Sequence, residues 1–437
     1  MNTVKKSKMS GAEIALVLVA GIASYLDAAI IVSTGVALPL WTMHYNMEPI
    51  VSGSVNTVLT IAIALGAMSG GWLSDRFGRV RVFNIDILFV TIGTLTVGFA
   101  PNMTILFIGL FISGFASGAD LPTSLAVISE RMSKEHYGRA LSSTQLFWTM
   151  GIILSQFIGF LTSKMGMMSA RYLFIWIGAV AFINWLVRVS SKKFQQIETG
   201  LVVTNPDTDE VEEEVEKVSL RDMLKQRRYL MSLIVLTTFY LFWNLPANTF
   251  GMFVNYFVVI IDHQSTAIAT AIALIGNILA FIVGMIYLRI SDTKARYPLM
   301  FVGVIGAFVA LLIAGALSNL WLVFAACYVL YQLGCVLCGE PQYKIWTQLF
   351  YPVNARASFT GLSLGIVRAI TAAFALITPV IMNYSAKLLF YILVVFVAIY
   401  GICLTQVMRL LRKYEVNDPT LPEKKGKKAA VKNSDEA

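Results

Sequence analysis

Residues 71–81, GWLSDRFGRVR, carry four charged side chains between two long apolar runs. Only 14% of the whole chain is charged, so this short connection differs sharply from the sequence on either side of it. The flanking runs, at 52–72 and 82–100, are each close to the ~20 apolar residues that cross a bilayer as a helix. The pattern therefore predicts a charged loop between two membrane-spanning helices.

Twelve apolar runs follow one another along the 437 residues. They cover 14–41, 52–72, 82–100, 104–128, 140–163, 171–189, 229–260, 265–289, 298–317, 320–343, 358–382 and 386–408. The chain is 57% hydrophobic with a mean hydropathy of +0.71, more apolar surface than a soluble protein of this length can bury. The first run is too long for a cleaved signal peptide, so we expect it to be retained. The sequence predicts an all-α integral membrane protein with twelve transmembrane helices.

Motifs of soluble catalysis and of metal binding are missing from this sequence. It contains no GxxxxGK[ST] phosphate loop, no hydrolase triad and no zinc motif. Cys335 and Cys338 have CxxC spacing, but neither a second pair nor a nearby histidine completes a metal site. We therefore expect a protein that is not an enzyme and that uses no cofactor and no metal.

Lysines and arginines fall mainly on one side of the predicted membrane. Of the 34, 30 lie on the side that holds both termini and the central loop. Lys164, Arg171 and Lys387 lie on the other side, and Arg368 lies within a run. The positive-inside rule assigns the rich side to the cytoplasm. We expect a multi-pass protein of the bacterial inner membrane with both termini in the cytoplasm. The net charge of +9 then reflects topology, and we expect no nucleic-acid partner.

The apolar runs and the charged stretches between them divide the chain into five segments. They are an N-terminal tail at 1–13, a six-helix half at 14–189, a central loop at 190–228, a second six-helix half at 229–410 and a C-terminal tail at 411–437. The loop contains PDTDEVEEEVEKVSLRDMLKQRR, which is typical of a solvated linker with an amphipathic segment. We expect the lysine-rich C-terminal tail to be disordered.

Charged loop residues recur in the two halves. Three pairs share an offset of 217 residues: Asp75 with Asp292, Arg79 with Arg296, and Arg139 with Arg356. Three pairs at one offset, in matching loops, indicate a duplicated six-helix unit. The predicted architecture is therefore two pseudo-symmetric halves, which in many secondary transporters enclose a substrate site near the membrane midplane.

Residues 71–81 are similar to the G-x-L-[SA]-D-R-x-G-R-[KR] signature of the major facilitator superfamily. The resemblance covers the whole chain, with twelve helices, a long middle loop and a degenerate second copy of the motif. It implies that this loop latches the two halves together on the cytoplasmic side, which favours the outward-open state. The latch residues so implied are Gly71, Asp75, Arg76, Gly78, Arg79, Glu130, Arg139, Asp292, Arg296 and Arg356.

Shorter patterns resemble the proton-coupled sugar-porter branch of that superfamily. They are YLDAAIIVSTG at 25–35, GRALSSTQLFWTMG at 138–151 and EPQYKIWTQLFYPVNARA at 340–357. GADLPTSLAVISE at 118–130 is also similar to porters for phosphate and organic acids. The chain departs from the branch where Leu110 replaces an arginine, and where Glu340 and Lys344 replace a glycine and a tryptophan. These departures argue against a plain neutral hexose as substrate.

Five ionisable residues within or at the ends of apolar runs are candidates for function, because a charge in the membrane is costly unless it is paired or faces water. They are Asp27, Asp120, Glu340, Lys344 and Arg368. A carboxyl group such as Asp27 can load a proton and release it when water reaches it from the other side. We expect Asp27 to couple transport to the proton gradient; the alternative is a structural ion pair with Arg368. Asp120 is either a second proton or substrate group or a helix-packing acceptor.

The remaining candidates would bind substrate. Glu340 and Lys344 are four residues apart on one helix face, either as a self-contained pair or as part of the cavity. Lys344 and Arg368 together would suit a substrate carboxylate. Amides match hydroxyl groups in donors and acceptors, and aromatic rings can stack on a sugar. The neutral candidates are Gln145, Trp148, Asn244, Asn248, Asn255, Asn277 and Tyr331.

These observations predict a secondary transporter that imports a sugar or sugar-derived metabolite with a proton, by alternating access. The alternative is a proton symporter for a carboxylated or aromatic organic acid. A drug exporter is disfavoured because the run at 140–163 contains no proline. The expected partners are a small-molecule substrate and the lipid bilayer, and we expect a monomer.

Overall fold

The structure is a computed structural model, and all of the regular secondary structure in its described residues is helical. It describes residues 11–77, 79–131, 134–190, 220–290, 293–317, 320–416 and 418. Eleven helices are long and apolar enough to cross a membrane, and the apolar part of a twelfth, Leu146–Leu161, is shorter. Eleven of the twelve predicted runs therefore each correspond to one main helix, the tenth is divided between two, and the fold is all-α as predicted.

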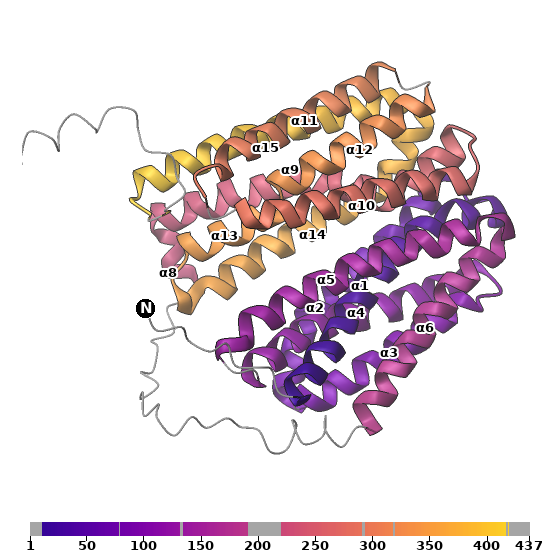
Figure 1. The fold of residues 1–437 in the computed structure, drawn as a ribbon, viewed down its shortest axis with the longest axis horizontal. Helices are drawn as coiled ribbons and strands as arrows, with labels where there is room; N and C mark the ends of the chain where they lie inside the picture. Colours follow the sequence, from indigo (N-terminus) through magenta and orange to yellow (C-terminus); the bar gives the residue numbers. More distant parts are fainter. Residues whose placement is uncertain are drawn as a thin grey trace, which may run out of the picture.

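The first half is a six-helix bundle (Figure 1). Its helices are α1 (Gly11–Tyr45), α2 (Pro49–Phe77), α3 (Arg79–Gly98), α4 (Met103–Arg131), α5 (Lys134–Leu161) and α6 (Met167–Ser190). A short 3-10 turn, η1 (Ser163–Met165), joins α5 to α6. The main pairings are α2 with α4, α3 with α4, α1 with α5 and α3 with α6.

The second half repeats the bundle with three additions. Its helices are α8 (Leu220–Lys225), α9 (Arg227–Tyr256), α10 (Thr266–Ile290), α11 (Arg296–Ala316), α12 (Trp321–Cys338), α13 (Glu340–Phe350), α14 (Val353–Tyr384) and α15 (Ala386–Lys413). The added elements are the short helix α8, the π-helical turn η2 (Phe257–Ile261) that extends α9, and the short helix α13. Most of the predicted central loop and of both tails lies outside the described residues.

The tenth predicted span is not one continuous helix, which corrects the single run expected at 320–343. α12 ends at Cys338, and Gly339 has a non-helical backbone with φ −105° and ψ −135° before α13 begins at Glu340. Pro341 stands in the first turn of α13, where its missing N–H breaks no helical hydrogen bond. A Cβ at Gly339 would clash with the Trp243 ring, so the glycine lets α9 approach the break.

The two halves meet near one end of the bundle. α1 begins and α15 ends at the same end, here called the terminal end, and the opposite end is the distal end (Figure 1). The contacts between halves pair α2 with α14, α5 with α10 and α1 with α9. In Figure 1 the ribbons of the halves converge toward the distal end and diverge toward the terminal end.

Small residues allow this close approach at the distal end. Thr57 of α2 donates a hydrogen bond to the carbonyl oxygen of Ala372 in α14 at 3.0 Å. One turn away, a Cβ at Gly53 would clash with the carbonyl oxygen of Leu376. A Cβ at Gly35 of α1 would lie 2.8 Å from a backbone oxygen of α9. Backbone therefore packs against backbone across the interface, as is common between membrane helices with small residues.

Replacing Gly53 with alanine tests whether this packing closes the distal end. The added methyl group cannot fit against the Leu376 carbonyl, so we expect Gly53→Ala to shift the protein toward a state that is open at the distal end. Spin labels at Glu48 and Ser265, which are exposed on opposite halves at that end, should move apart in pulsed electron spin resonance distance measurements.

Gly251→Ala is the matched control, because a Cβ at Gly251 of α9 meets nothing within 4 Å. Its label distances should equal those of the parent protein. Equal distances in Gly53→Ala and in the parent would show that the Gly53 contact does not control distal closure.

Candidate functional site

Asp27 lies near the middle of α1 and is 7% exposed. The Ser117 hydroxyl of α4 donates a hydrogen bond to Asp27 Oδ1 at 2.8 Å, and the Trp148 side chain of α5 lies near this carboxylate and stabilises its charged form. The guanidinium of Arg368, on α14, interacts with it electrostatically. Asp27 is therefore held by its own half and also acted on by a cation of the other half.

Small residues in the first half place these partners around Asp27. A Cβ at Gly118 of α4 would clash with the backbone of Ile63 in α2, so the glycine lets α4 pack closely with Ser117 toward α1. A Cβ at Gly151, one turn after Trp148, would clash with the Tyr25 carbonyl, so α5 also approaches α1 closely. The site thus depends on close helix packing as well as on its polar groups.

Glu340 and Lys344 form an ion pair within the first two turns of α13. Lys344 Nζ lies 2.7 Å from a Glu340 carboxylate oxygen, and the two side chains are 60% and 40% exposed. Arg368 also interacts electrostatically with Glu340. The self-contained pair considered from the sequence is therefore present, and Arg368 acts electrostatically on both Glu340 and Asp27.

An aromatic and polar wall from α9, α13 and α14 borders this group. Tyr240 stacks on Tyr343 with ring centroids 4.3 Å apart and on Trp243 at 5.6 Å. The Thr371 hydroxyl donates a hydrogen bond to Asn244 Oδ1 at 3.0 Å. Of the residues in this wall, only Asn244 is among the candidates predicted from the sequence. Tyr240 and Tyr343 could have been predicted from helical spacing, because they lie four and three residues from the candidates at 244 and 340 and therefore on the same helix faces.

Several predicted substrate residues do not join this group. Asn255 is fully buried, and the Tyr331 ring is 1% exposed and packs on Phe250 with centroids 4.6 Å apart. The Asn277 Oδ1 atom accepts a hydrogen bond from Gln332 at 3.5 Å, which links α10 to α12. Asn248 is half-buried on α9. The Gln145 side chain lies outside the described part of the chain.

Most of the predicted latch lies outside the described residues or side chains. This applies to Gly71, Asp75, Gly78, Arg79, Glu130, Arg139, Asp292 and Arg356. Arg76 is described: it is exposed at the end of α2, with its guanidinium carbon 5.6 Å from the centroid of the Phe77 ring. The latch therefore stays a prediction.

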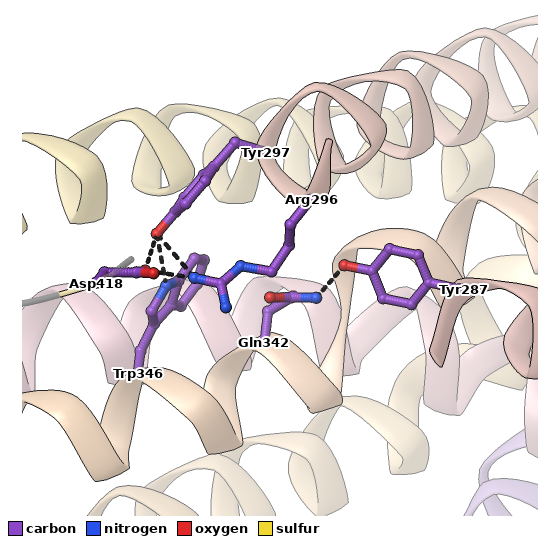
Figure 2. A network of polar contacts seen from close by, with 6 residues as sticks. All are labelled: Tyr287, Arg296, Tyr297, Gln342, Trp346 and Asp418. Atoms are coloured by element: carbon purple, nitrogen blue, oxygen red, sulfur yellow. Dashed lines mark hydrogen bonds and ion pairs between the residues drawn. The ribbon is translucent and has the colours of Figure 1, made fainter. Parts of the chain in front are cut away.

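Arg296, the remaining latch candidate, binds the chain segment that follows α15 (Figure 2). Its guanidinium forms an ion pair with Asp418, and these side chains are 3% and 1% exposed. The Tyr297 hydroxyl donates to the same carboxylate at 2.7 Å and accepts from the Trp346 indole at 3.3 Å. The contact ties α11 and α13 to residue 418, within the second half. From composition alone, residue 418 is predicted to lie in a disordered tail. The structure corrects this prediction, because the Asp418 carboxylate is buried and paired with Arg296.

Asp120 is 2% exposed on α4, and its Oδ1 lies 3.2 Å from Arg188 Nη1 of α6. The charge distribution in the sequence places Arg188 with the cytoplasmic loop charges, but it is fully buried two residues before the end of α6. The sequence places Arg188 in the loop because it lies at the edge of an apolar run. Its carboxylate partner is distant in sequence, so nothing nearby indicates that the arginine is buried. Asp120 therefore belongs to a second charged group, away from the Arg368 group.

Asp418→Asn tests the anchoring role of the Arg296 contact. Removing one partner of a buried ion pair leaves the other charge uncompensated, at a cost of about 3–5 kcal/mol. We expect a clearly lower melting temperature for the purified protein in detergent. Glu415→Gln, the same chemical change at an exposed position, should melt like the parent. Equal melting temperatures for all three proteins would rule out the anchor.

Comparisons with known proteins agree with this architecture. The family profile described as Major Facilitator Superfamily matches residues 17–376. The minor myo-inositol transporter IolF of Bacillus subtilis is 27% identical over 379 residues, covering 84% of each chain. The niacin transporter NiaP of Acinetobacter baylyi is 31% identical over 148 residues, 33% of each chain.

Among solved structures, the crystal structure of a D-xylose-proton symporter superposes with a TM-score of 0.71 at 16% identity. The match covers 95% of this chain and 99% of that one, so the two proteins share a fold. The profile match confirms the resemblance that began with residues 71–81. This multi-pass membrane transporter belongs to the major facilitator superfamily.

Proposed function

We propose that this transporter imports a neutral sugar or sugar-derived polyol together with a proton. The charge balance of the candidate site is the observation that carries this proposal. Lys344 is paired with Glu340 at 2.7 Å, and Arg368 interacts with both Glu340 and Asp27. Two cations thus face two carboxylates, and the opposite charges of Glu340 and Lys344, which from the sequence argue against a plain neutral hexose, offset each other within the site. A neutral substrate can enter such a site without leaving a charge unpaired, whereas an anion would unbalance it.

The neutral side chains of the site suit a substrate rich in hydroxyl groups. Asn244 and Thr371 offer donors and acceptors, and the rings of Trp148, Tyr240 and Trp243 offer apolar faces beside polar tips. The relative named as a myo-inositol transporter aligns along most of both chains, which supports a cyclic polyol within this class.

The place where the halves touch supports alternating access. Asp27, Ser117, Trp148 and Arg368 all lie near the middle of their helices, as expected of a midplane site. The charge distribution assigns the terminal end to the cytoplasm. On that assignment the distal contacts close the outer side, and the arrangement is inward-facing. Asp27 would then release its proton to the cytoplasm as substrate leaves.

An organic acid is the second candidate substrate. The relative named as a niacin transporter matches a third of the chain, and niacin carries a carboxylate on an aromatic ring. When Asp27 holds a proton, Arg368 loses one counter-charge and becomes able to bind such a group. This route requires protonation before substrate binding, whereas the neutral-substrate route does not.

Uptake into proteoliposomes under an inward proton gradient separates the two candidates. We expect saturable uptake of myo-inositol or of a neutral sugar such as D-xylose, and none of niacin, because both cations described at the site already face carboxylates. Protein-free liposomes provide the background. Saturable uptake of niacin, without uptake of myo-inositol or D-xylose, would contradict the proposal and show that the substrate is an organic acid.

Asp27→Asn tests proton coupling in the same assay. We expect accumulation driven by the pH gradient to be lost, while exchange of labelled for unlabelled substrate is retained, because exchange requires no net proton movement. Asp262→Asn is the matched control, since Asp262 lies beyond the end of the membrane-spanning segment. Burial raises the pKa of Asp262 to about 6, against the opposing effect of His263. Continued accumulation by Asp27→Asn would exclude Asp27 as the coupling group.

A further inference from the structure

Helices α2 and α14 contact each other across the two halves in an antiparallel register. Thr57 of α2 donates to the carbonyl oxygen of Ala372 at 3.0 Å, and a Cβ at Gly53 would clash with the carbonyl oxygen of Leu376. Four residues forward along α2 therefore correspond to four residues back along α14. Because α2 ends and α14 begins at the terminal end, this register can be followed in that direction (Figure 1).

Continuing the register toward the terminal end pairs Ala64 with Gly365 and Met68 with Gly361. On both helices these positions lie seven and eleven residues from the hydrogen bond between the halves. Seven and eleven residues are close to two and three full turns, so these positions share the helix faces that meet at the distal end. The register thus places Met68 opposite Gly361, about 16 Å along the helices from that hydrogen bond.

The structure leaves these paired positions apart. The Met68 side chain is 75% exposed. A Cβ at Gly361 or at Gly365 would meet nothing within 4 Å among the described residues, whereas a Cβ at Gly53 would clash with backbone. The same faces of α2 and α14 are therefore in contact near the distal end and separated toward the terminal end, where the ribbons of the two halves diverge (Figure 1).

The face of α14 that carries the two glycines is directed toward the other half. Arg368 lies on this face between Gly365 and Ala372, and its guanidinium acts on Asp27 of α1. Glycines four residues apart leave helix backbone uncovered, which allows a side chain or a second helix to approach closely. Methionine is long and flexible, so it can fill the irregular space over such backbone.

We propose that Met68 closes the terminal end of the transporter by packing onto the uncovered backbone at Gly361 and Gly365. The contact between Thr57 and α14 lies between the two ends and acts as the pivot. The contact at Gly53 opens as the contact at Met68 forms, so the two ends are not open together. This inference rests on alternating access in the proposed function, and it depends on no particular substrate.

Disulfide cross-linking of the reconstituted full-length protein tests this contact without any substrate. Met68→Cys and Gly361→Cys are combined, and a copper–phenanthroline oxidant is added. A protease site inserted between residues 190 and 220 then lets the two halves separate on a non-reducing gel unless a disulfide joins them. A disulfide holds its Cβ atoms about 3.8 Å apart, and a Cβ at 361 has no described atom that near, so a cross-link reports a second conformation.

We expect the halves of this variant to become joined. Met68→Cys with Leu362→Cys is the matched control, because one residue further along α14 the side chain points about 100° away. The four native cysteines are buried and stay in place, and the parent protein treated in the same way gives the background. Cross-linking no faster than in the Leu362→Cys control would overturn the proposal.

Gly361→Met provides a second test with a different pair as reporter. The reporter is the cross-link between Ala64→Cys and Gly365→Cys. A methionine at 361 extends into open space in this structure, but it occupies the place that Met68 takes in the closed state. The reporter cross-link should therefore be lost in Gly361→Met and restored by adding Met68→Ala. Gly306→Met, at another glycine whose Cβ would meet nothing within 4 Å, should leave it unchanged.

A reporter cross-link that persists in Gly361→Met, or that Met68→Ala does not restore, would contradict the assignment. Melting temperatures confirm that each compared protein is folded. Because no substrate is present, failure of the sugar proposal in uptake assays would leave these results unaffected.

Discussion

The structure depends on a carboxylate that is buried in the middle of a membrane helix. Asp27 needs donors or a cation when it is ionised, and among the described residues its own half supplies the neutral side chains of Ser117 and Trp148. The cation, Arg368, comes from the other half. Any movement of one half relative to the other therefore changes the electrostatic environment of this carboxylate. On the proposed function, this arrangement would couple proton binding to conformational change before any substrate is considered.

The second requirement is that the halves can meet and separate. Their contacts at the distal end rest on backbone packed against backbone, at Gly53 against Leu376 and at Gly35 against α9. Such contacts are short-ranged and need no desolvated charge pair to break, so they suit an interface that opens in each cycle. The strongly anchored contacts, Arg296 with Asp418 and Arg188 with Asp120, each lie within one half and preserve it as a rigid body.

The twelve-helix architecture could be predicted from the sequence because its two indicators, the lengths of the apolar runs and the charge asymmetry of the loops, need no knowledge of contacts between helices. It also named Asp27 as a candidate, because a carboxylate in the middle of a long apolar run is costly unless it is paired or faces water. It did not predict that Asp86 of α3 is buried, because Asp86 lies near the start of its apolar run and resembles a loop charge. It could not foresee the Arg188 and Arg296 pairings, because their partners lie 68 and 122 residues away. The break at Gly339 was hidden because Gly339 and Pro341 lie where an apolar run continues.

The central claim is that the Asp27 proton moves with the substrate. Proton entry caused by substrate alone tests it most directly. Proteoliposomes with equal pH on both sides and a pH-sensitive dye inside would receive an outside pulse of the sugar or polyol that shows saturable uptake. The account predicts that the lumen acidifies in step with substrate entry, and that Asp27→Asn abolishes the acidification. Substrate entry without a change in lumenal pH would contradict the account.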